Sequence, residues 1–275
     1  MSRTSKDQES LFFIFKGFVL SPRDVIKQAI AEVVVQKGFE ADYIKTHFSE
    51  LVTGTQKRAY DIFLDSQRNS WRKSIDVYLK RELGENVTRT EVTRFLASRF
   101  EELDSFFLSL TNSRRPRAGS AFQITISELF KKLDYPLVEQ PEIDGIPDFL
   151  LPSIEHFRKN PIDCIIFTVK RTLRERWRQI VTEGTRGLGF FLATIDESVS
   201  GKQLEEISAN RIYLVVPIGL KTGVDSYKSA VNVITFEDFF EDHLDPAFRR
   251  WVRAGITDSG KLATYTGPNE DTLRN

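Results

Sequence analysis

The sequence predicts an α/β protein with a mixed central sheet flanked by helices, preceded by a mostly helical N-terminal domain. Two changes of pattern support this prediction. Up to about residue 110, apolar residues recur at helical spacing, as they do after the helix start at Ser21-Pro22. From about residue 145, short apolar runs alternate with helical stretches, which is typical of strands joined by helices. The chain therefore divides into a helical part and a sheet-forming part.

Four helices are expected in the helical part. One begins at Ser21-Pro22, and the others span residues 41–51, 56–83 and 89–110. The segment from Thr111 to Ser120 is polar, basic and rich in helix-breaking residues, so we expect a surface connection there, followed by a helix to about Leu133. The expected boundaries are 1–110 for the helical domain, 111–256 for the α/β domain and 257–275 for a polar tail without periodicity.

The α/β domain is expected to alternate strands with helices. The expected strands are 145–151, 163–170, 188–195 and 212–217, and the expected helices are 173–185, 201–209 and 235–244. The strand 163–170 is apolar until its last residue, Lys170. Such a run is expected to lie buried in the sheet with its charged end at one edge.

Composition limits the classes of function. Lys+Arg and Asp+Glu both number 39, so the net charge is zero, and any nucleic-acid surface must be local rather than spread over the whole protein. The single cysteine, Cys164, excludes an internal disulfide and a multi-cysteine zinc site, which fits a reducing cytoplasm. Lys16 interrupts the apolar residues near the start, so we expect neither a signal peptide nor a membrane span there.

Three ionisable residues have the chemistry of a metal-dependent nuclease. Hydrolysis of a phosphodiester needs a divalent ion held by hard oxygen ligands, and Asp148 and Glu183 supply carboxylates. Lys170, at the end of a buried strand, can orient the attacking water and offset developing negative charge. A Pro-Asp pair such as Pro147-Asp148 is by itself usually a turn. The combination of three residues is what makes a nuclease the leading interpretation.

A charged cluster close to Lys170 can supply sequence recognition. Arginine pairs bidentately with guanine in the major groove, and a carboxylate accepts from cytosine N4. Arg174, Glu175 and Arg176 combine both kinds of group four to six residues after Lys170. The alternative is that this run is only the solvated face of a helix.

The second half of the chain contains a series of short motifs. The motifs are Arg115-Pro116-Arg117-Ala118-Gly119, Pro147-Asp148-Phe149-Leu150-Leu151-Pro152-Ser153, Thr168-Val169-Lys170, Arg174-Glu175-Arg176-Trp177-Arg178-Gln179, Ser200 with Gln203-Leu204, and Leu214-Val215-Val216-Pro217. In order and spacing, these motifs resemble the EcoRII, SsoII and PspGI group of type II restriction endonucleases. The likeness covers roughly residues 114–252, whereas the helical part matches by position more than by motif.

The resemblance implies a PD-(D/E)XK, restriction-endonuclease-like fold and an Mg²⁺-dependent homodimer. Its substrate would be double-stranded DNA, cut with 5′ overhangs at a CCNGG or CCWGG pseudopalindrome, and a companion DNA methyltransferase would protect the host. Asp148 and Glu183 would be metal ligands and Lys170 the catalytic lysine. In this group the second acid of the motif is displaced, so that Thr168 stands two positions before Lys170 and Glu183 takes the place of the acid in space.

The resemblance also implies the residues that contact DNA. Arg174, Glu175 and Arg176 would read the C·G pairs. Four further arginines would contact or position the backbone: Arg115, Arg117, Arg171 and Arg178. The helical domain would contribute DNA contacts, the pocket for a flipped central base and dimer contacts.

One position departs from the family pattern. Several relatives carry a further acidic residue on the helix after the Arg-Ala-Gly motif, where this chain has Gln123, with Glu128 later on the same helix. A glutamine can bind a water or a metal through its carbonyl oxygen but contributes no charge. Gln123 is therefore an auxiliary active-site candidate, and the number of metal ions stays open.

Relatives that recognise five base pairs extrude the central bases, and a flipped base needs a flat partner on which to stack. Trp71, with Arg68 one helical turn earlier, is the candidate for this pocket. The competing interpretation is that Trp71 is a core or domain-interface residue.

Two other classes of function stay open at this point. The chain could be a catalytically degenerate protein that binds specific DNA, in which case binding would persist without Mg²⁺-dependent cleavage. It could also be a nuclease of the same fold that chooses substrates by structure, with its arginines on phosphates. Mutated sites would distinguish these, because a phosphate binder responds to salt rather than to sequence.

Overall fold

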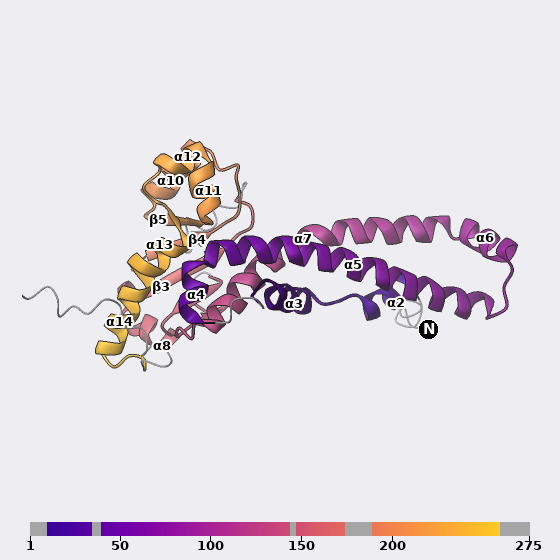
Figure 1. Cartoon of the computed structure of the whole chain (residues 1–275), viewed down its shortest axis with the longest axis horizontal. Helices are drawn as coiled ribbons and strands as arrows, with labels where there is room; N and C mark the ends of the chain where they lie inside the picture. The colour runs from indigo at the N-terminus through magenta and orange to yellow at the C-terminus, as the bar shows by residue number, and fades with distance from the viewer. Residues whose placement is uncertain (1–9, 35–39, 144–146, 174–188, 259–275) are drawn as a thin grey trace, which may run out of the picture. The chain divides into compact units, whose positions relative to one another are not determined.

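The computed structural model describes residues 10–34, 40–143, 147–173 and 189–258 (Figure 1). Contacts within the chain group it into two compact units. The helical unit consists of Met1–Glu32 and Thr55–Ala121, and the sheet unit consists of Val33–Gly54 and Phe122–Asn275. The boundaries between the units follow residues 32, 54 and 121, each inside a helix, and the segment 33–54 belongs with the sheet.

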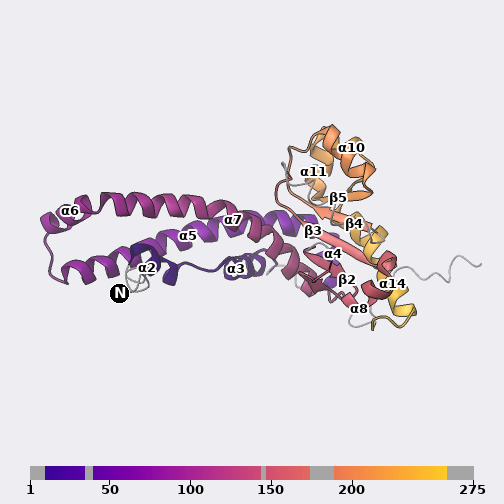
Figure 2. The ribbon, with the colours of Figure 1, turned by 180° about the vertical axis from the view of Figure 1, so that it is seen from behind.

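The helical unit is built around two long antiparallel helices. These are α5 (Phe48–Leu83) and α7 (Phe100–Lys132), which lie side by side in both views of the ribbon, joined through the short α6 (Arg89–Ser98) (Figures 1 and 2). The shorter α2 (Leu11–Phe18) and α3 (Pro22–Val34) precede them. Only the parts of α5 and α7 up to the unit boundary belong to the helical unit.

An aromatic cluster holds the helical unit together, and helix caps fix where its elements begin. Its buried members are Leu11, Phe15, Tyr78 and Phe106, with Trp71 packed against them. Local sequence explains two helix starts. Ser10 accepts a hydrogen bond from the Phe13 amide at the start of α2, and Thr88 and Glu91 form a capping box at the start of α6.

The expected connection over residues 111–120 is wrong, because α7 runs through it without a break. Pro116 lies inside the helix, where proline removes one hydrogen bond and costs about 3 kcal/mol. Buried apolar residues on both sides, Phe106 and Phe122, stabilise the helix on either side of the proline. Packing over a long helix therefore outweighs a local breaker.

Other helices in this part of the chain differ from the expectation in their boundaries. The expected helix 41–51 is divided at His47 into α4 (Ala41–Thr46) and the first turns of α5. The expected helix 89–110 is likewise divided, with α6 ending at Ser98 and α7 beginning at Phe100. The helix after Ser21 is confirmed as α3, and Ser21 Oγ accepts from the Asp24 amide at 3.2 Å.

The sheet unit contains one six-stranded mixed sheet, which confirms the predicted fold class. The strands lie in chain order: β1 (Val138–Glu139), β2 (Phe149–Leu151), β3 (Ile165–Val169), β4 (Gly189–Ala193), β5 (Ile212–Val216) and β6 (Val233–Thr235). β1, β2 and β3 pair antiparallel, whereas β3 to β6 are parallel. The short β1 and β6 lack the length for a periodic signal and were not predicted.

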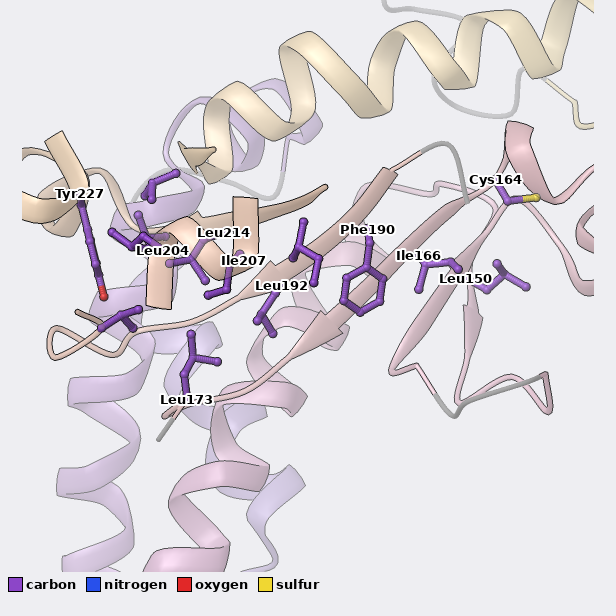
Figure 3. Close-up of a cluster of buried hydrophobic side chains, with 14 residues drawn as sticks. Leu150, Cys164, Ile166, Leu173, Phe190, Leu192, Leu204, Ile207, Leu214 and Tyr227 are labelled. Atoms are coloured by element: carbon purple, nitrogen blue, oxygen red, sulfur yellow. The ribbon is translucent and has the colours of Figure 1, made fainter. Parts of the chain in front are cut away.

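The two faces of the sheet are covered by different side chains. One face packs aliphatic residues of β2 to β5, such as Leu150, Ile166 and Leu192, against Leu204 and Ile207 of α10 (Gly201–Ala209) (Figure 3). The other face packs phenylalanines. Phe130 of α7 lies 5.3 Å from Phe167, and Phe239 lies 4.9 Å from Phe167 and 4.8 Å from Phe191, measured between ring centroids.

Helices and short turns complete the sheet unit. α10 matches the expected helix 201–209, and the expected helix 235–244 consists of a short α13 (Phe236–Asp238) followed by a π-helical stretch, η3 (Phe239–Leu244). The remaining elements are α8 (Ile154–Lys159), η1 (Pro161–Asp163), α11 (Ile218–Gly223), α12 (Asp225–Ser229) and α14 (Asp245–Arg253). The expected helix 173–185 and the tail 257–275 lie largely outside the described residues.

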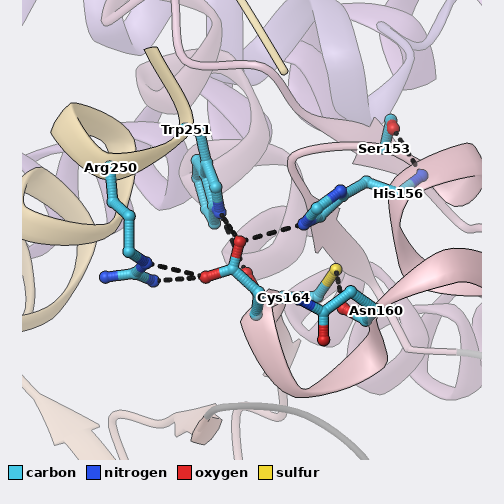
Figure 4. Close-up of polar contacts among 7 residues, drawn as sticks. Ser153, His156, Asn160, Cys164, Arg250 and Trp251 are labelled. Carbon is cyan, nitrogen blue, oxygen red and sulfur yellow. Dashed lines mark hydrogen bonds and ion pairs between the residues drawn. The ribbon is translucent and has the colours of Figure 1, made fainter. Parts of the chain in front are cut away.

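A polar cluster that includes His156, Arg250 and Trp251 (Figure 4) fixes α14 to the start of β3 through Asp163. Its carboxylate accepts from Arg250 Nε at 2.8 Å and from Trp251 Nε1 at 3.1 Å, and lies 2.9 Å from His156 Nε2. Cys164, the next residue, is fully buried, and burial raises the pKa of its thiol to about 12. The cysteine is therefore an inert core residue. No helix within the described ranges has both the length and the apolar character needed to cross a membrane.

Candidate active site

Asp148 lies immediately before β2, where the end of the sheet brings its carboxylate over β3. Oδ2 accepts a hydrogen bond from the Val169 amide at 2.7 Å, and Oδ1 accepts one from Gln123 Nε2 at 2.7 Å. The residue is 8% exposed. A buried carboxylate held by a backbone N–H and by a side chain on another element has a single orientation, as a site for chemistry requires.

Lys170 follows β3 directly and brings its ammonium to the same carboxylate. Its Nζ lies 3.6 Å from Asp148 Oδ2, and its own amide donates to the Ala193 carbonyl of β4 at 2.9 Å. The lysine side chain is 40% exposed, whereas that of Asp148 is 11% exposed. The fixed backbone therefore places one end of this pair inside the protein and the other at the solvent.

Burial raises the pKa of Asp148 above its usual range. The positive charge of Lys170 is the largest opposing influence, followed by the hydrogen bond from the Val169 amide, and then by the polar contacts of the Lys170 and Gln123 side chains in that order. A nearby positive charge favours the charged form of such a carboxyl and so lowers its pKa. A divalent cation would act in the same direction as Lys170.

Gln123 stands in this site as the sequence suggested. It lies on the last part of α7, half-buried, and its amide reaches Asp148. Asp148, Lys170 and Gln123 are therefore the three predicted site residues that the structure brings together. In the described part of the chain, no three His, Cys, Asp or Glu side chains cluster in the way a metal ion needs.

The remaining parts of the predicted site lie outside the described residues. These are the second acid, Glu183, and the arginine-rich run with Arg174, Glu175, Arg176 and Arg178. Their roles stay predictions.

The arginines predicted to contact the DNA backbone differ in their surroundings. Arg115 lies within α7. Arg117 is half-buried, stacks over the ring of Phe63 at 5.2 Å and donates to the Leu20 carbonyl at 3.4 Å. Arg171 is exposed and lines a hollow of about 270 Å³ together with Asp196 and Ser198. Arg171 is therefore the more available of these two for an anion.

Arg68 and Trp71, the predicted base pocket, have different partners in the helical unit. Trp71 packs against Phe106 and Phe107, with ring centroids 5.3 and 5.4 Å away. Arg68 pairs with Asp65 at 3.2 Å, and the arginine side chain is 73% exposed. The packing favours the core interpretation for Trp71, and the pocket assignment stays a prediction.

Sequence reasoning missed a hollow of about 310 Å³ in the helical unit. It is lined by an exposed aromatic ring, by charged groups and by amides, among them Phe18, Arg58, Asn69 and Lys73. Its residues come from α2, the segment after it, α3 and α5, so no single stretch of sequence reveals it. The only local signal is Phe18, an apolar residue placed just before the Ser21-Pro22 helix start.

Comparison with known proteins identifies the family of this chain. The sequence matches the family described as EcoRII C terminal over residues 81–240, which is more than half of the chain. The match includes Gln123, Asp148, Lys170 and Glu183. It also begins earlier than the motifs indicated, near the end of α5.

Two relatives and one solved structure are similar to this chain over long stretches. The type II restriction enzyme SsoII of Shigella sonnei is 24% identical over 234 residues, covering 80% of this chain and 76% of SsoII. The type II restriction enzyme EcoRII of Escherichia coli is 31% identical over 145 residues, covering 49% of this chain and 35% of EcoRII.

The solved structure extends the likeness to the fold of both units. Metal-depleted Ecl18kI in complex with uncleaved, modified DNA has a TM-score of 0.73 at 22% identity, and the match covers 90% of this chain and 87% of that one. The fold is thus that of restriction endonucleases. The family match, the two relatives and the order of the site residues agree: this chain belongs to the EcoRII C-terminal family, within the type II restriction endonucleases.

Proposed function

We propose that this restriction endonuclease cleaves double-stranded DNA by Mg²⁺-dependent hydrolysis, with Asp148, Lys170 and Glu183 as its catalytic residues. The observation that carries the proposal is the contact between the buried Asp148 carboxylate and the Lys170 ammonium, 3.6 Å apart at one edge of the sheet. This pairing of a fixed acid with a solvent-facing amine suits a scissile phosphate that arrives from solvent.

The donor set fits a magnesium ion. Magnesium prefers oxygen ligands and keeps several of its waters, so it needs few protein groups. The Asp148 carboxylate offers such oxygens, and each has lone pairs beyond the one used by its amide partner. Asp148 and Glu183 would hold the ion, which would polarise the phosphate and lower the pKa of the attacking water.

The protein's own groups have separate roles in this mechanism. Gln123 fixes the carboxylate orientation through its donated hydrogen bond, and the Val169 amide fixes it from the backbone. Lys170 carries a positive charge to the phosphate, where negative charge develops in the transition state. The neutral amide of Gln123 adds no anion to the centre, which favours one metal ion over two.

For the recognition sequence, we propose CCNGG or CCWGG, cut to leave 5′ overhangs. Arg174, Glu175 and Arg176 have the groups that read C·G pairs in the major groove. A pseudopalindrome is matched by a protein with twofold symmetry, so the active form would be a homodimer with one site on each strand. A companion methyltransferase would modify the same sequence.

The experiment is digestion of an unmethylated phage genome by the full chain with MgCl₂, followed by sequencing of the ends. The proposal expects fragments that share one pseudopalindromic site and a fixed overhang, and no cleavage in EDTA. Ends at unrelated sequences would support a nuclease that chooses by structure. Specific binding without any cleavage would contradict hydrolysis and favour a degenerate DNA-binding protein.

We also propose that the central bases are extruded, and two receiving places compete. One is the predicted pair Arg68 and Trp71, and the other is the hollow beside Phe18. The hollow has the volume of a small-ligand pocket and an exposed ring on which a base can stack. The test uses a duplex with 2-aminopurine at the central position, whose fluorescence rises when the base is extruded. Phe18→Ala should reduce this rise if the hollow receives the base, and Trp71→Ala should reduce it if the pair Arg68 and Trp71 receives the base.

A further inference from the structure

Thr168 carries a buried hydroxyl for which the described chain offers no hydrogen-bond partner. The residue lies in β3 and is 1% exposed, and its Oγ1 is one of two such buried side-chain atoms among the described residues. A buried polar atom without a partner is unfavourable, and in a native structure it calls for an explanation such as a water or an ion. The position of Thr168 supplies one.

The sheet places Thr168 beside the Asp148 carboxylate. Phe149 pairs with Phe167 in antiparallel register, so the next step brings Asp148 opposite Thr168. The amide that donates to Asp148 Oδ2 belongs to Val169, the residue directly after Thr168. The hydroxyl is thus carried on the backbone segment that holds the carboxylate.

Lys170, two residues after Thr168, lies close to the same carboxylate. Residues two apart on a strand point to the same face, so Thr168 and Lys170 share a face up to the end of β3. The other neighbours of Thr168 on this face are apolar: Ile166 lies two residues earlier on β3, and Leu192 is the register partner of Thr168 on β4. Thr168 is the polar residue among these apolar neighbours, and it lies next to Asp148 and Lys170. A valine has the same shape and would pack equally well, so packing alone does not require the hydroxyl.

We propose that the Thr168 hydroxyl is a positioning group of the metal site, which binds a water of the divalent ion held by Asp148. This inference rests on the proposed function, because it takes Asp148 as a metal ligand. Magnesium and manganese keep several waters when bound to carboxylates, and such waters need acceptors and donors in the protein. A water of the bound ion would supply the hydrogen-bond partner that the described chain does not offer to this hydroxyl.

The competing explanation is an ordinary core threonine. Under that explanation, Thr168→Val removes an unpaired hydroxyl without changing shape, and metal binding is unaffected. The chain offers a matched control in Thr55, the other buried hydroxyl without a partner in the described residues, which lies in α5 rather than on the sheet. Thr55→Val shows how the loss of a buried hydroxyl outside the sheet affects Mn²⁺ affinity.

The test is a titration of the metal-free full chain with MnCl₂, with free Mn²⁺ measured by electron paramagnetic resonance. We expect Thr168→Val to weaken Mn²⁺ binding about tenfold, as loss of a group that supports metal ligands does. Thr168→Ser, which keeps the hydroxyl, should retain most of the affinity, and Thr55→Val should bind as the unaltered chain does.

The outcomes separate this inference from the proposed function. Unaltered Mn²⁺ affinity in Thr168→Val, with binding lost in Asp148→Ala, overturns the role of the hydroxyl and leaves the metal site intact. Equal weakening in Thr168→Ser and Thr168→Val also overturns it, because packing rather than the hydroxyl would then matter. Unaltered affinity in Asp148→Ala removes the metal assignment and this inference with it.

Discussion

The two units treat their charged side chains differently. In the helical unit, ion pairs lie at the surface: Arg68 and Asp65 are 73% and 66% exposed, and Lys80 and Asp76 are 55% and 62% exposed. The sheet unit also has surface pairs, such as Lys228 with Asp225, but among the described residues it adds buried ones: Lys45 and Asp245 pair at 2.6 Å with only 7% and 22% of their side chains exposed. Surface pairs contribute about 0–1 kcal/mol, whereas buried charges need several partners to be tolerated.

This difference indicates which unit suits hydrolysis and which suits contacts with the DNA backbone. Buried charges with several partners are held in one geometry, as hydrolysis requires. Asp148 has three partners, and Asp245 has two in Lys45 and Tyr135. Exposed charges on long helices can instead rearrange, which suits the DNA backbone contacts proposed for the helical unit. The predictions that follow test this division.

The largest effect is expected from Asp148→Ala. Removing the buried carboxylate should lower the cleavage rate at least about a thousandfold, because the metal and Lys170 lose their common partner. Specific binding in Ca²⁺ should persist. A gel assay of plasmid cleavage and a filter-binding assay measure the two quantities.

Asp225→Ala is the matched control for that change. The Asp225 side chain is 97% exposed and pairs only with its neighbour Lys228 among the contacts described. Its removal should leave the cleavage rate unchanged. Comparable loss in both variants would show that Asp148 acts through general stability instead of chemistry.

A smaller effect, on stability, is expected from Asp245→Ala in the sheet unit. The variant leaves the buried Lys45 ammonium without its carboxylate, so the free energy of unfolding should fall by about 3–5 kcal/mol. Asp65→Ala in the helical unit removes a surface partner of Arg68 and should change it by less than about 0.5 kcal/mol. Urea denaturation of both variants measures the contrast, and equal losses would break it.

A further prediction concerns DNA recognition, where the expected change in binding free energy is smaller than the loss of stability in Asp245→Ala. Arg176→Ala should reduce discrimination at one G·C pair by about 1–3 kcal/mol, whereas Arg171→Ala should weaken all sequences alike and reduce the salt slope by about one. Competition binding with single-pair substitutions, repeated at several salt concentrations, measures both. An unchanged sequence preference in Arg176→Ala would count against base reading.

The sequence predicted the sheet better than the helices, for a physical reason. β3, β4 and β5 are buried apolar runs bounded by polar residues, and both the strand and its burial follow from composition. The course of α7 through Pro116 depends on apolar contacts made on both sides of the proline, which local sequence does not contain. The same limit applies to β1 and β6, which exist only through pairing.

The candidate site likewise contains residues that the sequence predicts and contacts that only the fold reveals. Asp148 and Lys170 were predictable because each stands at the end of a recognisable strand and carries a chemistry that core packing does not need. The family pattern indicated Gln123 as an auxiliary active-site residue, but its hydrogen bond to Asp148 follows only from the folded geometry. The hollow beside Phe18 could not be predicted, because its lining comes from segments far apart in sequence. The sequence placed Thr168 two positions before Lys170, but that its hydroxyl is buried without a partner follows only from the fold.

The smallest effect concerns two tyrosines, and it tests whether the contrast extends to uncharged groups. Burial raises the pKa of Tyr78 in the helical unit and of Tyr227 in the sheet unit, both to about 12. The pKa of a tyrosine in the unfolded chain is about 10. The contribution of each neutral, buried phenol to the free energy of unfolding is therefore fully present below pH 10 and is lost as the pH rises from 10 towards 12. Tyr78→Phe and Tyr227→Phe should each flatten this decline in urea denaturation between pH 9 and about 11. A decline that only Tyr227→Phe flattens would mean that the Tyr78 phenol ionises in the folded chain as freely as in the unfolded one, against its 3% exposure in the structure.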